Sequence, residues 1–246
     1  MLIYIAEMKL IVKFISSFLL TLLFASNNIW AAASAIDKLL LLSDSTKCIQ
    51  CHEDISPDWE TSHHSHSLID IDVLTSIKKE LNTPGVVKLE VLKSCASCHA
   101  PQINFASEEA GEMIIALIEN TNAKKGDSTF QKAKKMLGSL NINCRVCHMS
   151  KGMAEGEISP NIIYGPGWDE HEHSHMENYG FDTIKSDYLG SIEFCTNCHR
   201  DIASESLSQV HSLTHKKETM ERSKATNSTC KDCHMSSGHS FKHEGQ

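Results

Sequence analysis

The sequence alternates short stretches of helical periodicity with polar connecting segments. Apolar residues recur at helical spacing over residues 73–81, 108–119, 128–140 and 204–222, which are also rich in good helix formers. Asp127 or Ser128 is suited to cap the third of these stretches. The alternation typical of half-buried strands is almost absent. The pattern predicts a mostly α protein, with helices and long loops and little or no sheet.

One connecting segment, residues 151–167, is rich in Gly and Pro and predicts a surface loop. No other stretch divides the chain, so we expect residues 32–246 to form one domain.

The first residues have the order of charge and hydrophobicity that is typical of an export signal. Lys9 and Lys13 precede an apolar run over residues 14–25, and small residues follow at 31–35. We expect residues 1–31 to be removed as a signal peptide, which places the mature protein in the periplasm. The alternative is an uncleaved membrane anchor, because residues 1–5 lengthen the apolar stretch towards the ~20 residues that span a bilayer. Glu7, Lys9 and Lys13 interrupt that stretch and favour cleavage.

The number and spacing of the cysteines and histidines are the most informative features of the sequence. The 246 residues include ten Cys and fifteen His, and every Cys belongs to a Cys-x-x-Cys pair followed directly by His. The motifs are Cys48/Cys51/His52, Cys95/Cys98/His99, Cys144/Cys147/His148, Cys195/Cys198/His199 and Cys230/Cys233/His234. In such a motif the two thiols bond to the haem vinyl groups and the histidine is the proximal iron ligand. The sequence predicts five covalently attached haems c.

Other uses of paired cysteines fit less well. Structural zinc needs two pairs, or one pair and two histidines, for each ion and gives no reason for a histidine after every pair. A disulfide framework is compatible with an oxidising compartment, and a thioredoxin-like redox protein uses one Cys-x-x-Cys pair. Neither explains the five histidines.

The expected number of haems determines how much of the core the protein's own side chains can form. Residues 32–246 supply roughly 43 residues for each haem, too few for a separate apolar core around each porphyrin. We therefore expect the haems to form much of the core and to lie close enough for electrons to pass between irons. The formal net charge is −8, and haem propionates add to it. This charge favours basic protein surfaces as partners and disfavours nucleic acid.

Ten further histidines are candidates for the second axial position of each iron. They are His63, His64, His66, His171, His173, His175, His211, His215, His239 and His243. About half must have another role, such as exposure to solvent or a hydrogen bond to a propionate.

An internal repeat guides the choice among them. Trp59 to His66 and Trp168 to His175 share Trp, His, Ser and His at equal offsets. We expect the Trp of each copy to pack on a porphyrin. The repeat favours His64 and His173, and the position after the last motif favours His239. For the other two places His175, His66, His211 and His215 compete, and we take His175 and His215.

Methionine is a weaker candidate ligand. Met149 and Met235 directly follow proximal histidines and cannot reach the far face of the same haem. Ligation by a more distant Met is the alternative. The expected ligation is bis-histidine, which is typical of low reduction potential.

Several motifs resemble the multihaem cytochromes c grouped with hydroxylamine oxidoreductase and its tetrahaem electron-accepting partner. These are the first haem motif with the Trp-x-x-Ser-x-His run that ends at His64, Tyr164-Gly-Pro, the segment from Ser191 to His199, and the last motif with His239-Ser-Phe. The resemblance implies a mostly helical fold in which stacked haem pairs alternate with perpendicular ones. It also implies that His64 and His239 are distal ligands.

Three functional classes remain. The chain lacks the length of the catalytic relatives and has no Cys-x-x-Cys-Lys variant of the kind that marks the active haem of pentahaem nitrite reductases. We expect an electron carrier between redox proteins: a quinol-oxidising membrane complex, and a terminal reductase or an outer-membrane conduit. The alternatives are a small oxidoreductase acting on a nitrogen or sulfur oxyanion at one open haem, and a subunit of an extracellular haem conduit.

Overall fold

The computed structural model describes residues 36–121, 126–165, 172–199, 229–235 and 239. Residues 36–43 are helical. The further elements are α2 (Thr46–Ile49), α3 (Ser56–Glu60), η1 (His63–His66), α4 (Ile71–Leu81), α5 (Lys88–His99), η2 (Pro101–Phe105), α6 (Glu108–Asn120), α7 (Ser128–Gly138), α8 (Cys144–His148), α9 (Ser150–Ala154), β1 (Ile162–Gly165), α10 (Glu172–Tyr179), β2 (Asp182–Lys185), η3 (Tyr188–Gly190), α11 (Ile192–Thr196) and α14 (Cys230–His234). The fold is mostly α, as predicted. The predicted signal peptide and the helix over 204–222 lie outside the described residues.

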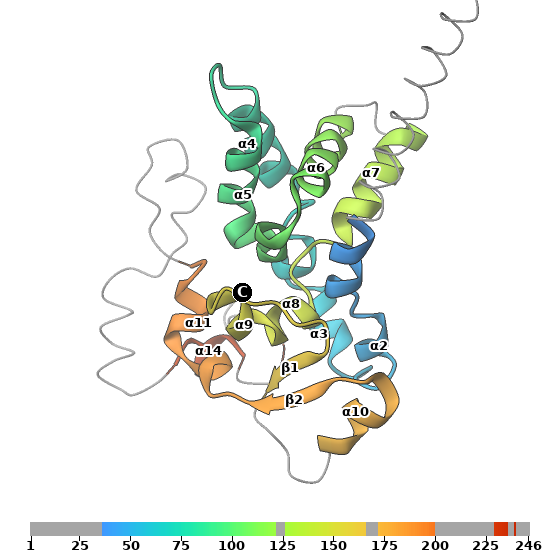
Figure 1. The fold of residues 1–246 in the computed structure, drawn as a ribbon, viewed down its shortest axis with the longest axis vertical. Coiled ribbons are helices and arrows are strands. Elements are labelled where there is room, and N and C mark those ends of the chain that lie inside the picture. Colours follow the sequence, from blue (N-terminus) through green and yellow to red (C-terminus); the bar gives the residue numbers. More distant parts are fainter. Residues whose placement is uncertain (1–35, 122–125, 166–171, 200–228, 236–238, 240–246) are drawn as a thin grey trace, which may run out of the picture.

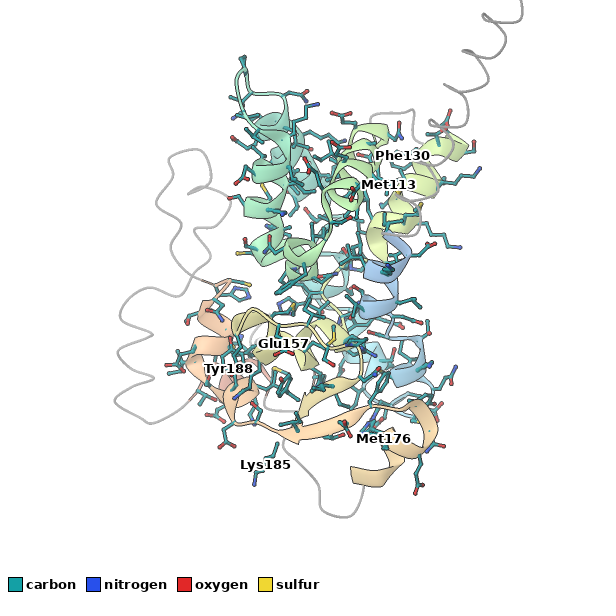
Figure 2. All side chains as sticks on the ribbon, viewed as in Figure 1. Met113, Phe130, Glu157, Met176, Lys185 and Tyr188 are labelled. Atoms are coloured by element: carbon teal, nitrogen blue, oxygen red, sulfur yellow. The ribbon has the colours of Figure 1, made fainter. Side chains whose placement is uncertain are left out.

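Helices α4, α5, α6 and α7 pack side by side at one end of the molecule (Figure 1). Their inward faces form an apolar core that includes Leu74, Ile77 and Ile118, and Met113 packs against it between the helices (Figure 2). Asp70 caps α4, where its carboxylate accepts hydrogen bonds from Asp72 N at 2.9 Å and Val73 N at 3.3 Å. This layer has a core of packed apolar side chains.

Three of the helices expected from periodicity are confirmed. Residues 73–81 lie in α4, 108–119 lie in α6, and 128–140 correspond to α7. Asp127 is the N-cap of α7 and accepts from Thr129 N at 2.7 Å. Helix α7 ends at Gly138, two residues early, because Leu140 and Asn141 turn into the interior.

The other end of the molecule contains a two-stranded parallel sheet (Figure 1). Strands β1 and β2 pair with Ile163 opposite Thr183 and Tyr164 opposite Ile184. A parallel pair needs a crossover connection, and α10 lies in it. The predicted surface loop over 151–167 is wrong in part, because it contains most of α9 and all of β1. The strand forms through pairing with a segment about twenty residues later, which a local pattern of Gly and Pro cannot reveal.

The sheet end has few buried apolar side chains of its own. Among its described residues these are Val146, Met149 and Phe181. Helices α2, α8, α11 and α14 also lie at this end (Figure 1), and each begins or contains a cysteine motif. Four of the five motifs are therefore collected where protein side chains supply the least core, whereas the second motif ends α5 of the helical layer.

Asn141 joins the helical layer to the segment that follows His64. Its side chain is buried, and Oδ1 accepts from Leu68 N at 2.8 Å and from Ile69 N at 3.3 Å, while Nδ2 donates to Ser65 O at 2.7 Å. The backbone next to His64 is thereby held to the end of α7.

Replacement of Asn141 by leucine should lower the free energy of unfolding by about 2–4 kcal/mol, because it leaves buried backbone groups unpaired. Chemical denaturation followed by far-ultraviolet circular dichroism measures this loss. Asn120→Leu at the exposed end of α6 is the matched control and should change stability by less than about 0.5 kcal/mol. Equal stability of the two variants would contradict the structural role of Asn141.

Candidate haem-binding site

Each cysteine motif lies on about one helical turn. Helices α8 and α14 contain their motifs entirely, and the second motif forms the last turn of α5. The first and fourth motifs begin in α2 and α11 and continue the turn, since His52 N donates to Cys48 O and His199 N to Cys195 O, both at 2.9 Å. Residues three and four apart lie on one side of such a turn. In the first four motifs both cysteines and the histidine therefore face the same way, as attachment of one haem requires.

The thiols are in the form that such attachment needs. None of the nine cysteines whose side chains the structure describes forms a disulfide. Within the same part of the chain, no group of three or more His, Cys, Asp or Glu residues is arranged to hold a bare metal ion.

Cys51 and Cys233 differ from the other eight predicted attachment cysteines. Cys51 is exposed, whereas the other eight described cysteines are half-buried, and its Sγ lies 3.7 Å from the Tyr179 hydroxyl. It is exposed because α2 ends at Ile49 and Cys51 lies in the turn that follows, at the surface. Cys233 belongs to α14, but its side chain lies outside what the structure describes. The bonds of all ten cysteines to haem stay predictions.

Two proximal histidines are oriented by backbone carbonyls. His99 Nδ1 lies 2.9 Å from Ser67 O, and His148 Nδ1 lies 2.7 Å from Tyr164 O in β1. A carbonyl oxygen only accepts hydrogen bonds, so Nδ1 carries the proton in both rings. The other nitrogen, Nε2, is then unprotonated, which is the form that binds a metal, and the hydrogen bond fixes the plane of the ring.

Three proximal histidines each face a second histidine from a distant part of the chain. The ring centroids of His52 and His175 are 6.1 Å apart with planes at 20°. Those of His148 and His239 are 6.4 Å apart at 25°. His64 and His199 are 6.0 Å apart at 75°.

The spacing of these pairs fits one iron between two imidazoles. An imidazole nitrogen binds a metal at about 2 Å, and the ring centroid lies roughly 1 Å behind it, so axial ligands on one ion have centroids about 6 Å apart. The cysteine pairs, the oriented Nδ1 atoms and the three histidine pairs all fit haem of c type. These features suit a haem-binding site of the c-type cytochrome class.

Burial keeps these imidazoles neutral. Desolvation, with smaller contributions from His199 and His63, lowers the pKa of His64 to about 4. Desolvation also lowers the pKa of His148, against the opposing effect of its hydrogen bond to Tyr164, and it lowers the pKa of His175 and His239. Neutral imidazole is the form that binds a metal, so the lowered pKa values keep these histidines in the form that could bind iron.

The motifs contact one another in pairs. The Cys48 thiol is hydrogen-bonded to Cys144, and this contact raises the pKa of Cys48 and lowers that of Cys144 to about 6. The second and fourth motifs make reciprocal contacts, with Cys98 Sγ 3.9 Å from Cys198 O and Cys198 Sγ 3.7 Å from Ser97 O. Burial raises the pKa of Cys147 to about 12, and the nearby Cys144 and Cys195 add to that shift. The third motif thus lies between the first and the fourth.

The two copies of the sequence repeat differ in structure. In the first copy His64 lies in η1 and faces His199, whereas in the second copy His175 of α10 faces His52. His175 corresponds in the repeat to His66, whose side chain is exposed and contacts Ser65 Oγ at 2.6 Å. Equal offsets therefore do not give equal positions.

The remaining predicted site residues form none of the three histidine pairs described above. His173 belongs to α10, but its side chain lies outside what the structure describes, as do Trp168, His171, His211, His215 and His243. His234 ends α14. Trp59 is half-buried and donates from Nε1 to Ile142 O at 2.9 Å, and its expected packing on a porphyrin stays a prediction.

Several residues that contact the histidines lie outside the Cys-x-x-Cys-His motifs. Ser67 and Tyr164 orient proximal histidines through backbone carbonyls, and the Thr183 hydroxyl lies 3.4 Å from His175 Nδ1. Thr183 and Tyr164 are on adjacent strands. The small sheet thereby contacts one histidine of each of two pairs, which periodicity could not predict.

Comparison with known proteins agrees with this class. Residues 47–116 match the family described as cytochrome c554 and c-prime. No curated protein and no solved structure matches the chain. The matched segment covers the first two haem motifs and His64, and it supports covalent c-type haem and haem-based electron transfer. It does not extend to a grouping with hydroxylamine oxidoreductase.

Within the described residues, no helix combines the length and hydrophobicity needed to cross a bilayer.

Proposed function

We propose that this protein carries five covalently bound haems c, mainly with two axial histidines each, and transfers electrons between redox proteins in the periplasm. The five motifs supply the attachment points. The main support for this proposal is the set of three histidine pairs, whose ring centroids lie 6.0–6.4 Å apart. When bound, each haem iron would supply one-electron chemistry between the ferric and ferrous states.

The proposed axial ligands follow from these pairs. His175 would complete the iron of the first motif, His239 that of the third and His64 that of the fourth. His173 and His215 are then the proposed ligands for the haems of the second and fifth motifs. This set uses every histidine that the sequence favoured.

The protein's own residues would hold both axial positions closed. Ser67 O and Tyr164 O hold the proximal rings of His99 and His148 in orientation. Fixed ligands keep the coordination geometry the same in both oxidation states and exclude small substrates from the irons. This favours an electron carrier over an oxidoreductase. Its proposed partners are a quinol-oxidising membrane complex, and a terminal reductase or an outer-membrane conduit.

The exposed first attachment site suits such a carrier. A haem bonded to Cys51, whose side chain is exposed, would reach the surface of the protein at one edge. Electrons enter or leave a carrier through a haem that a partner can approach closely, so the first haem is the proposed contact with one redox partner.

Purified protein should contain five covalent haems, all low-spin. Intact mass and the pyridine haemochrome spectrum give the number of haems, and electron paramagnetic resonance of the oxidised protein gives their spin states. Optical spectra with nitrite, hydroxylamine or carbon monoxide test for an open iron. A high-spin haem that binds these ligands would overturn the carrier proposal in favour of an oxidoreductase, and fewer than five haems would refute the count.

A further inference from the structure

Arg145 occupies an unusual position inside the third haem motif. It lies between Cys144 and Cys147 on α8, and only 3% of its surface is exposed. Charged side chains are almost never buried to this extent unless an opposite charge is paired with them.

The contacts of Arg145 hold the guanidinium without neutralising it. Nη2 donates to Pro160 O at 2.6 Å and lies 3.5 Å from Met149 Sδ. The guanidinium carbon lies 4.3 Å from the ring centroid of Phe181, in cation–π geometry. Nε is buried and has no hydrogen-bond acceptor among the described residues.

No carboxylate forms an ion pair with Arg145 within the described part of the chain, where the ion pairs are Lys88–Glu119 and Lys151–Glu155. The carboxylate of the nearby Asp44 instead accepts two hydrogen bonds at the start of α2. They come from Thr46 N at 2.9 Å and from Thr46 Oγ1 at 2.6 Å. A guanidinium does not deprotonate in proteins. Arg145 is therefore a permanent positive charge in a largely dry environment.

This charge lies beside the attachment points of two haems. Arg145 directly follows Cys144, and its field reaches Cys48, where it opposes the rise in the pKa of that thiol. Cys48 and Cys144 belong to the first and third motifs and contact each other. Lys47 extends the same positive region towards solvent, with Nζ 6.0 Å from the Phe181 ring.

We infer that Arg145 is a potential-setting residue that raises the reduction potentials of the haems on the first and third motifs. Oxidation of an iron adds one positive charge, and a fixed cation nearby disfavours that charge, most strongly where water is excluded. The inference rests on the proposed function, because it needs haems at both motifs. It assigns to Arg145 a task that neither attachment nor axial ligation performs.

The test is a spectroelectrochemical titration of matched variants of the full-length, haem-loaded protein. Arg145→Met keeps the length and removes the charge, Arg145→Gln also keeps a donor for Pro160 O, and Arg145→Lys keeps the charge. Lys185→Met removes an exposed charge that projects from β2 away from the body of the protein (Figure 2). Lys47→Met removes the outer cation of the same region.

We expect both neutral variants to lower the potential of two couples. The expected size is about a tenfold change in the ratio of oxidised to reduced haem at fixed potential, which equals about 59 mV for a one-electron couple. Arg145→Lys should shift the same couples by less than half as much, and Lys185→Met should shift none. Lys47→Met should lower the same two couples by a smaller amount, so it tests the same field if the neutral Arg145 variants do not mature.

The possible outcomes separate this inference from the proposed function. Haem counts of wild-type protein test the proposed function alone. If the wild type carries its haems and the neutral variants, with full haem content, keep all five potentials, Arg145 has no such role and the carrier proposal stands. Equal shifts from Arg145→Lys and Arg145→Met would also overturn the inference, because shape and not charge would then be responsible.

Discussion

Replacement of His64 by alanine should convert one haem, the one attached at Cys195 and Cys198, from six-coordinate low-spin to five-coordinate high-spin. His64 faces His199 with ring centroids 6.0 Å apart, and burial keeps it neutral with a pKa of about 4. Alanine removes the only atoms that could reach the iron from that position. The four other haems should keep their spectra, because they depend on other histidines.

Electron paramagnetic resonance of the oxidised variant measures this change, and uptake of carbon monoxide by the reduced variant confirms the open position. The planes of His64 and His199 are 75° apart, whereas the other two pairs are near parallel. Near-perpendicular axial rings leave two iron orbitals close in energy, so the low-spin signal that disappears should be the most anisotropic one.

His66→Ala is the matched control for this prediction. His66 lies two residues further on in the same turn, but its side chain is exposed. We expect this variant to keep every haem low-spin. A high-spin haem in His66→Ala, or a fully low-spin His64→Ala protein, would show that the pairing of His64 with His199 is not the axial ligation.

Loss of the third attachment site should damage the protein more than loss of the fifth. The double variant Cys144→Ala/Cys147→Ala should lack one haem, and its thermal unfolding midpoint should fall by more than about 10 °C, which corresponds to several kcal/mol for a chain of this size. Helix α8 contacts β1, and its cysteines approach both the first and the fourth motif. Removal of that haem therefore leaves a void where few apolar side chains are buried.

Cys230→Ala/Cys233→Ala is the matched control, because it also removes one attachment site. Among the described residues, Cys230 contacts Cys195 of the fourth motif. Intact mass should show the loss of one haem in both double variants, and circular dichroism should show the smaller thermal shift in this one. Equal shifts would mean that the third haem is not a central part of the core.

The local helices were predictable because their causes are local. Asp70 and Asp127 cap α4 and α7, and apolar residues at helical spacing bury one face of each helix. Both signals lie within a dozen residues, so periodicity and capping preference reveal them. The apolar core of the α4–α7 layer was not predicted, because the expected number of haems suggested that porphyrins would form much of the core.

The environment of each attachment site could not be predicted from the motifs, because all five motifs read alike. Cys51 is exposed beside Tyr179, whereas Cys147 of the third motif is half-buried. The difference arises from what packs around each turn, since α8 contacts β1 and α9 while α2 ends two residues before Cys51.

The histidine pairs were harder to predict, because equal offsets in the sequence repeat do not give equal positions in the structure. His175 reaches His52 only because α10 lies in the crossover between β1 and β2, where the Thr183 hydroxyl contacts it. His66 has the same offset in the first copy, but the 3-10 turn η1 presents His64 to His199 instead. A one-dimensional pattern does not distinguish an α-helical turn from a 3-10 turn at this length.

The sequence by itself determined the number and type of attachment motifs and the mostly helical class, because a Cys-x-x-Cys-His motif and a helix period each complete their chemistry within a few residues. Only the tertiary structure decided which histidines face each other, which motifs lie side by side and where the buried charge of Arg145 acts. Those features depend on side chains that are far apart in the chain and meet through strand pairing and helix packing. The physical division is therefore between motifs formed by neighbouring residues and histidine pairs formed by distant ones.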